Sequence, residues 1–269
     1  MKKIALILAI LMALFCFTAC GGSDNGGSTS GDSDLAYVKD KGTLIVGITD
    51  FAPMDYKEEG SNEWIGFDAD MAKEFAKELD VEIKFIEITN WDNKSIELDT
   101  KAIDVVWNGM TLTDDVKSLM GTSEAYCKNA QVVVTKADKA ADIKTVDDIK
   151  GLSFAVENGS AGAEALDDVG ISYTAVQNQA MALMEVASGA SEASVIDLLM
   201  AKAMVGEGTD YADLTYTVVE LTSEEYGVGF RKGSDLVSTF NDFWKKAYDA
   251  GTVTKVATTY GIEQNIIAK

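Results

Sequence analysis

The sequence contains no histidine among its 269 residues. Histidine is the commonest general base and the commonest metal ligand at neutral pH, so its absence argues against hydrolase and zinc chemistry. The chain also lacks the Gly-rich loop with which nucleotide-binding proteins hold phosphates. We therefore predict a protein that is not an enzyme, with no catalytic residue, no metal site and no cofactor.

Positive charge is scarce. Arg231 is the single arginine, and the formal net charge is −21. Nucleic-acid binding needs basic patches that neutralise phosphates, so we expect no nucleic-acid partner. Hydrophobic residues make up 47% of the chain and charged residues 25%, which is ordinary for a folded protein of one or two domains.

The amino-terminal segment has the features of an export signal. Lys2 and Lys3 precede an apolar run over 4–17, and small residues lead to Cys20. This arrangement is typical of a secretory signal peptide, and the run is too short for a comfortable transmembrane span. A simple secreted protein and a membrane anchor that is not cleaved remain as alternatives.

Residues 17–20 (FTAC) resemble a bacterial lipobox, in which Cys20 would be lipidated and become the mature amino terminus. Residues 21–34 are rich in Gly, Ser and Asp and predict a flexible tether. We expect a protein anchored by lipid to the extracytoplasmic face of the cell membrane. A mature protein that begins at Cys20 would retain one other cysteine, Cys127, without an intrachain partner, and we expect it to be a small buried residue.

Strands alternate with helices along the rest of the chain, which predicts an α/β fold. We expect two lobes joined by two crossings of the chain: residues 35–128 together with 222–269, and residues 129–221. The strands are expected at 44–48, 81–86, 103–107, 129–135, 153–156, 171–176, 193–196, 215–221 and 226–233. The helices are expected at 66–79, 180–188, 236–250 and 254–260, with Asp68 as an amino-terminal cap of the first.

The ends of three strands predict a binding site, because ligands of α/β proteins bind at the carboxyl ends of the strands. One strand ends in Asn108, Gly109, Met110 and Thr111. A second leads to a helix start at Ser160 and Ala161, whose first N–H groups have no partner within the helix. A third ends in Asp197, a carboxylate that needs a helix amino terminus, a lysine or a bound amine as its partner. An ordinary strand-to-helix turn is the alternative for the first segment.

The motifs WNGMTLT (107–113), GFDADMAKEF (66–75) and YGVGFRKG (226–233) resemble those of the family 3 solute-binding proteins, the extracytoplasmic receptors of amino-acid ABC transporters. The resemblance covers nearly everything after the tether. It implies a two-lobed periplasmic-binding-protein fold of type II that closes on a small molecule by hinge motion. It also implies an ABC permease and its ATPase as partners, and we expect the receptor to be a monomer.

The resemblance further assigns roles in the site. It implies that Asp197 binds the α-amino group of an amino acid or amine, and that Phe51 and Trp91 stack on opposite sides of the ligand. Core packing is the alternative for either aromatic residue. The arginine with which the family binds the ligand carboxylate falls on Val116, which has no donor. We therefore expect a cationic amine or a modified amino acid without a free α-carboxylate, with ordinary polar amino acids as the second choice.

Two other functions fit parts of this pattern. The same fold hosts a few enzymes, such as cyclohexadienyl dehydratases, which an assay for prephenate or arogenate turnover would detect. A sensory or scaffold lipoprotein would bind a ligand without feeding a transporter. Permease and ATPase genes beside the coding sequence would favour transport over this second alternative.

Overall fold

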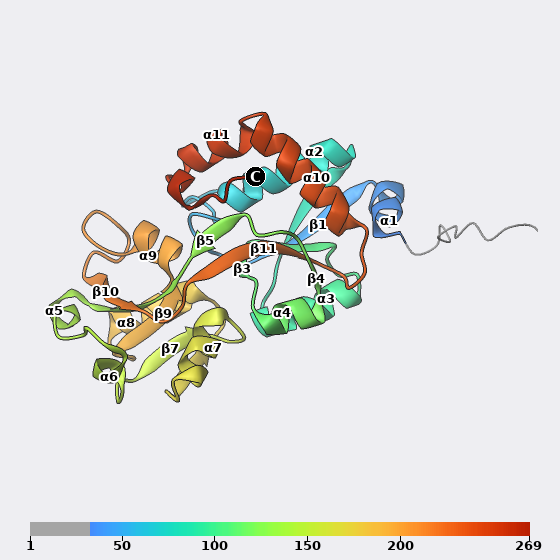
Figure 1. The fold of residues 1–269 in the computed structure, drawn as a ribbon. Coiled ribbons are helices and arrows are strands. Elements are labelled where there is room, and N and C mark those ends of the chain that lie inside the picture. The colour runs from blue at the N-terminus through green and yellow to red at the C-terminus, as the bar shows by residue number, and fades with distance from the viewer. Residues whose placement is uncertain (1–32) are drawn as a thin grey trace, which may run out of the picture. The chain divides into compact units, whose positions relative to one another are not determined.

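Two β-sheets with their helices make up residues 33–269, the part of the chain that the computed structural model describes (Figure 1). The strands are β1 (Thr43–Ile48), β2 (Glu82–Glu87), β3 (Val105–Thr111), β4 (Gly121–Thr122), β5 (Cys127–Asn129), β6 (Gln131–Lys136), β7 (Phe154–Glu157), β8 (Tyr173–Val176), β9 (Ala193–Asp197), β10 (Leu214–Glu220) and β11 (Glu224–Phe230). The helices are α1 (Asp34–Lys41), α2 (Phe67–Leu79), α3 (Lys94–Asp99), α4 (Asp114–Leu119), α5 (Ala137–Ala140), α6 (Val146–Ile149), α7 (Ala161–Asp168), α8 (Gln179–Ser188), α9 (Leu198–Met204), α10 (Leu236–Asp249) and α11 (Thr252–Thr259), with short 3-10 turns η1 (Trp91–Asn93) and η2 (Glu263–Asn265). The predicted signal peptide, Cys20 and most of the predicted tether lie outside the described residues.

The first sheet has the order β2-β1-β3-β11-β4, with β5 beside β11. Strands β1, β2 and β3 are parallel, and β11 runs antiparallel to β3. Helices α2, α10 and α11 cover one face, while α3 and α4 lie on the other side (Figure 1). Because β1 and β3 are parallel, their carboxyl ends lie at the same edge of the sheet, where a crevice forms.

A cluster of buried aromatic side chains packs against β3. The α2 side chains Met71 and Phe75 are 0% exposed, and Phe75 contacts Trp107 of β3 with their ring centroids 6.4 Å apart. Phe240 of α10 completes the group, 4.9 Å from Trp107. Helical four-residue spacing places the α2 apolar residues on one stripe, which packs on the sheet. The strand that carries the predicted binding residues is thus fixed by close packing.

The second sheet has the order β10-β6-β9-β7-β8, and helices cover both of its faces. In β6, Val132 and Val134 belong to one buried cluster with Leu183 of α8, whereas Val133 belongs to another with Leu166 of α7. Successive side chains of a strand point to opposite faces, so an unbroken valine run indicates burial on both sides.

The chain passes between the sheets twice. It leaves β5 for β6 through Ala130, and it returns from β10 to β11 through residues 221–223. The N–H of Leu221 donates to the carbonyl of Gln131 (2.8 Å), and the N–H of Gln131 donates to the Thr222 hydroxyl (3.1 Å). The two crossings therefore lie side by side, which is the arrangement that permits hinge motion between two lobes.

The first described residues differ from the tether expected over 21–34. Ser33 caps α1 by accepting a hydrogen bond from the N–H of Ala36 (3.0 Å), and its hydroxyl donates to Asp235 (2.5 Å). Asp34 forms an ion pair with Arg231 (2.8 Å). The polar composition of the segment led to the prediction that Ser33 and Asp34 belong to the tether. Their partners lie about 200 positions away in the sequence, so no local pattern indicates these contacts.

Asp68 is not a helix cap, and that prediction is wrong. The N-cap of α2 is Gly66, which makes no side-chain capping bond. The Asp68 carboxylate instead accepts hydrogen bonds from the N–H of Gly109 (2.6 Å) and the hydroxyl of Tyr126 (2.7 Å). Asp68 is 0% exposed, and its carboxylate oxygens bind Gly109 of β3 and Tyr126 instead of the first N–H groups of α2.

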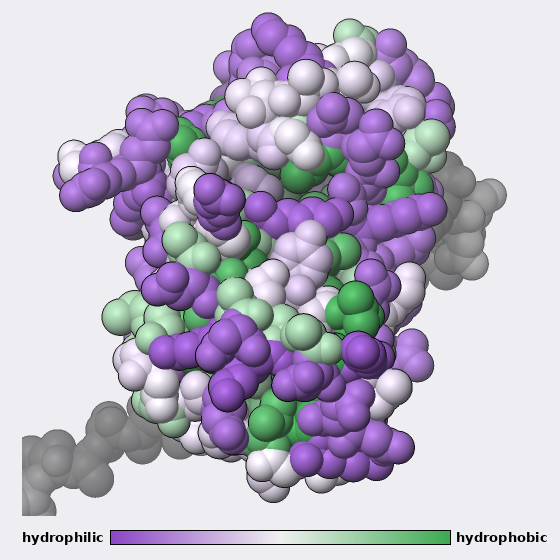
Figure 2. Space-filling model, turned by 90° about the vertical axis from the view of Figure 1, so that its left-hand side faces the viewer, coloured by the Kyte–Doolittle hydropathy of each residue, from purple (hydrophilic) through white to green (hydrophobic). Residues whose placement is uncertain are grey.

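One face of the molecule is largely hydrophilic. Figure 2 shows one face on which hydrophilic side chains predominate and apolar ones are interspersed among them. In the described part of the chain, no helix is both long and apolar enough to cross a bilayer.

Cys127 is 0% exposed and its thiol is free, so the predicted burial of this residue is confirmed.

Candidate functional site

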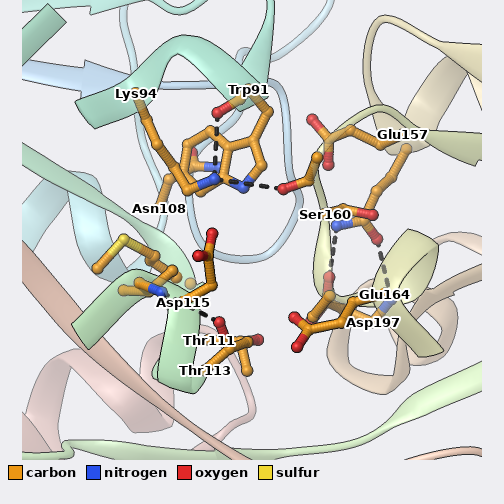
Figure 3. Close-up of a pocket in the computed structure, with 16 residues that line it drawn as sticks. Trp91, Lys94, Asn108, Thr111, Thr113, Asp115, Glu157, Ser160, Glu164 and Asp197 are labelled. Carbon is orange, nitrogen blue, oxygen red and sulfur yellow. Dashed lines mark hydrogen bonds between the residues drawn. The ribbon is translucent and has the colours of Figure 1, made fainter. Parts of the chain in front are cut away.

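A cavity lies between the end of β3 on one side and the ends of β7 and β9 on the other (Figure 3). The volume within it that a water molecule can occupy is about 60 Å³, so the cavity is narrow in this conformation. Every ligand-binding residue predicted from the sequence lines it except Phe51: Trp91, Asn108, Gly109, Met110, Thr111, Val116, Ser160, Ala161 and Asp197. The structure adds Lys94, Thr113, Asp115, Glu157, Gly159, Glu164 and Gln179.

Asp197 ends β9 and is held by uncharged donors. Its carboxylate accepts hydrogen bonds from the side-chain amides of Asn129, Gln131 (3.1 Å) and Gln179, and from the hydroxyl of Tyr226. Its N–H donates to the Gln179 side chain (2.9 Å). Burial raises the pKa of Asp197 well above its usual value, and the carboxylate of Glu224 raises it further. In the described residues the partners of this carboxylate are therefore amide and phenol groups, and neither a lysine nor a helix N–H group donates to it.

Glu157 ends β7 and is a second buried carboxylate of the cavity. It is 3% exposed, and its Oε1 has no hydrogen-bond partner within residues 33–269. Burial raises its pKa to about 8, against the opposing influence of the Lys94 charge. An unpartnered buried oxygen is costly, so its place at the cavity marks it as an acceptor for a bound molecule. Glu157 was not predicted from the sequence, although an acidic residue at the end of an apolar strand was the same signal that identified Asp197.

Lys94 begins α3 and carries the one ammonium group among the residues that line the cavity. It is 8% exposed, and its Nζ donates to the carbonyls of Trp91 and Gly159, each at 3.2 Å. The same Nζ lies 5.1 Å from the centre of the Trp91 ring. Burial lowers the pKa of Lys94. No sequence signal distinguished this lysine from the exposed ones.

Two apolar side chains of the cavity come from the side of the first sheet. Trp91 and Val116 are both 7% exposed and belong to one buried cluster with Met110. Thr113 caps α4 by accepting a hydrogen bond from the N–H of Val116 (3.2 Å), which fixes where this valine lies. Val116 thus lines the cavity without contributing a donor.

Phe51 does not line the cavity. It is 1% exposed, and its ring stands edge-on to Tyr226 with the centroids 6.3 Å apart. It also packs behind Gly109, whose φ is +55° and where a Cβ would come within 2.5 Å of the Phe51 ring. Glycine is required here because the backbone is left-handed and the ring approaches closely. In this structure Phe51 packs against Gly109, which lines the cavity, and against Tyr226, which donates to Asp197.

The two sides of the cavity approach each other at Gly159. This residue has a φ of +68°, and a Cβ there would lie 2.7 Å from the Cα of Asp92. Ser160 follows as the N-cap of α7, and its side chain accepts from the N–H of Ala163 (3.2 Å). Asn158 also donates to Asn90 across the same gap (3.2 Å). The start of α7 is therefore brought against the η1 and α3 segment.

The cavity is strongly acidic. The carboxylates of Asp115, Glu157, Glu164 and Asp197 line it together with the ammonium of Lys94. Asp115 belongs to α4 and Glu164 to α7, so like charges face each other across the cavity (Figure 3). Burial raises the pKa of Glu164, and the neighbouring carboxylates, Asp168 before Asp115, raise it further. Such an arrangement favours the entry of a cation.

Comparison with known proteins identifies the class that this fold and site define. The sequence matches the bacterial extracellular solute-binding proteins of family 3 over residues 44–263. The chain belongs to this family, which confirms the resemblance seen in its motifs.

Similar proteins bind several amino acids. The arginine-binding extracellular protein ArtP of Bacillus subtilis is 32% identical over 95% of this chain and 96% of its own, and the L-cystine-binding protein TcyA of the same organism is 30% identical over 96% of each. The crystal structure of a mutant of ArgBP from T. maritima has a TM-score of 0.78 at 30% identity, covering 84% of this chain and 98% of that one. An ancestral amino-acid-binding protein, AncCDT-1, described as a precursor of cyclohexadienyl dehydratase, has a TM-score of 0.76 at 30% identity over 85% and 99%. The type II periplasmic-binding-protein fold is thereby confirmed.

Proposed function

We propose that this protein binds an amino acid with a positively charged side chain and delivers it to an ABC permease driven by its ATPase. The observation that carries the proposal is the acidic cavity, in which Asp115, Glu157, Glu164 and Asp197 face the single ammonium of Lys94. Cationic ligands gain from this field, whereas acidic amino acids are repelled by it. The arginine-binding relatives are consistent with such a ligand.

The ligand's amino group is expected at Asp197. The carboxylate is surrounded by donors that fix its position, and a bound ammonium would supply the charge that these neutral groups lack. Glu157 shares the Gln179 side chain with Asp197, and its free Oε1 offers a further acceptor beside it.

A groove continues from the cavity and leaves room for a side chain. The volume within the groove that water molecules can occupy is about 470 Å³. Lys94, Asp115 and Glu164 line both the groove and the cavity. Asp92 and Asp167 add two more carboxylates to its lining. A ligand with a guanidinium or ammonium at the end of its side chain would place that cation among these acids.

A thermal-shift screen tests the ligand class. The panel comprises L-arginine, L-lysine, L-histidine, L-glutamine and L-cystine, with agmatine and cadaverine as decarboxylated partners of the first two. Binding at about a hundred times the dissociation constant stabilises a protein by roughly 2.7 kcal/mol, which a melting curve detects. We expect the largest shifts from L-arginine or L-lysine. Larger shifts from the matched amines would support a ligand without a carboxylate, and no shift from any amino acid would overturn the proposal.

We also propose that the protein acts as a receptor and not as a dehydratase. The AncCDT-1 neighbour makes the enzymatic alternative worth testing, by incubation with prephenate or arogenate and detection of the aromatic product. Turnover above the uncatalysed rate would contradict the receptor assignment.

Membrane attachment through Cys20 is a further part of the proposal, and it rests on the sequence of residues 1–34 alone. Acylation would hold a monomeric receptor at the extracytoplasmic face beside its permease. Mass spectrometry of membrane-fraction protein tests this, with Cys20→Ala expected to release the protein. An intact junction between residues 17 and 20 would contradict it.

A further inference from the structure

Lys94 is a buried cation without a carboxylate partner. In the described part of the chain, no carboxylate oxygen lies within the 4.0 Å ion-pair distance of its Nζ, although the charges of Asp92, Glu157 and Asp115 act on it. Burial of an ammonium is unfavourable unless an anion or strong acceptors compensate for the lost water. We infer that Lys94 binds the carboxylate of the amino-acid ligand, an inference that rests on the proposed function.

The hydrogen-bond geometry leaves one donor available. A lysine ammonium carries three hydrogens, and two of them serve the carbonyls of Trp91 and Gly159. The Trp91 ring lies beside the ammonium, 5.1 Å from Nζ. The two carbonyls come from opposite sides of the cavity, so they hold Nζ at the boundary between them. The third hydrogen is left for an acceptor that the described residues do not supply.

The start of α7 lies beside this ammonium and adds donors for an anion. Gly159, whose carbonyl receives the Lys94 hydrogen, directly precedes the N-cap Ser160. Ser160 and Ala161 line the cavity, and the first N–H groups of an eight-residue helix favour negative charge. A carboxylate here would contact Lys94 and the first turn of α7 together.

The two ends of the cavity then match a zwitterion. Asp197 and Glu157 offer carboxyl groups at the ends of β9 and β7, whose ionised form a bound ammonium would stabilise, and Lys94 offers positive charge at the start of α3 (Figure 3). An α-amino acid presents an ammonium and a carboxylate on one carbon, which suits such a pair of subsites. Because Lys94 also donates to Gly159 across the gap, carboxylate binding would favour the closed arrangement.

The test compares L-arginine with L-argininamide, which lacks only the carboxylate charge, by isothermal titration calorimetry. Lys94→Met removes the ammonium, Lys94→Arg restores a cation, and Lys117→Met removes one exposed charge outside the cavity as a matched control. We expect Lys94→Met to weaken L-arginine on the order of ten- to a hundredfold, because a charge-assisted hydrogen bond is lost. L-Argininamide should change by less than about threefold, and Lys94→Arg should retain most of the affinity for L-arginine.

Equal losses for the acid and the amide would overturn the inference while leaving the proposed function intact. If the screen shows that another amino acid binds instead, that amino acid and its amide serve as the probes. Absence of binding by every amino acid to the wild-type protein would overturn the proposed function and this inference together. Lys94→Gln is used if Lys94→Met does not fold, since its amide still reaches main-chain carbonyls.

Discussion

Two buried cations of this protein have opposite surroundings. Arg231 and Lys94 are each 8% exposed. Arg231 forms ion pairs with Asp34 (2.8 Å) and Asp104 (3.4 Å), and its Nη1 donates to the carbonyls of Leu98 and Ile103. Lys94, in contrast, has main-chain carbonyls as its acceptors and no ion pair in the described residues.

The difference separates a charge that is paired with carboxylates of the protein from one that remains available to a ligand. Arg231 pairs with acceptors of the protein itself, so this arginine links α1 and the segment before β3 to the end of β11. The charges around the cavity are incompletely satisfied, both at Lys94 and at the free Oε1 of Glu157. A protein that binds a charged molecule must leave such groups available, at a cost in stability. Four substitutions sharpen this comparison, from the largest expected effect to the smallest.

Arg231→Met should have the largest effect, and on stability. Loss of the guanidinium leaves Asp34 and Asp104 buried with fewer partners, which we expect to lower the free energy of unfolding by about 3–5 kcal/mol. Urea denaturation measures this. Lys246→Met is the control, because its exposed pair with Glu78 should contribute less than about 1 kcal/mol. Equal losses in the two variants would contradict a structural role for Arg231.

Asp197→Asn should act mainly on binding. Removal of the charge that faces the ligand's ammonium should raise the dissociation constant on the order of a hundredfold, as measured by calorimetry with the amino acid found in the screen. Asp68→Asn is the matched control, since Asp68 is equally buried and also accepts from a tyrosine hydroxyl but does not line the cavity. That variant should lose stability with less than about a tenfold change in affinity. The proposed amine site would be wrong if the two variants bound equally well.

Glu157→Gln should change the pH dependence of stability. Burial raises the pKa of Glu157 from 4.5 to about 8, so in this range the folded protein retains a proton that the unfolded chain releases. The associated stability is fully present below pH 4.5 and is lost as the pH rises towards 8. Glutamine stays neutral at every pH. The melting temperature of the ligand-free variant minus that of the wild type should therefore increase by a few degrees from pH 5 to pH 8. A difference that stays constant with pH would contradict the buried ionisation.

Trp91→Leu should give the smallest effect. Its ring lines the cavity, and loss of cation–π attraction worth roughly 0.5–2 kcal/mol should weaken the binding of a cationic ligand by about two- to thirtyfold. Phe51→Leu is the comparison, because Phe51 packs behind Gly109 and Tyr226. We expect Phe51→Leu to lower the melting temperature with a smaller change in affinity. The opposite result would restore the predicted stacking of both rings on the ligand.

Local patterns were sufficient to predict most of the strands and the longest helices. Apolar runs such as 44–48 and 193–196 coincide with β1 and β9, and the four-residue spacing of Met71, Phe75 and Leu79 coincides with the buried face of α2. Strand ends also pointed to residues that line the cavity, because the carboxyl ends of parallel strands lie at the same edge of a sheet. These predictions needed only periodicity and chain direction.

The roles of charged residues were beyond these patterns. Asp68 has the position of a helix cap in sequence, but its partners Gly109 and Tyr126 are 41 and 58 residues away. Lys94 meets Gly159 across 65 residues, and Arg231 meets Asp34 across 197. The sequence by itself determined the family, the two sheets and the strand ends that form the site, since these follow from local hydrophobic patterns. The tertiary structure alone decided which buried charges are paired and which remain open to a ligand, because pairing depends on distances between segments remote in the chain.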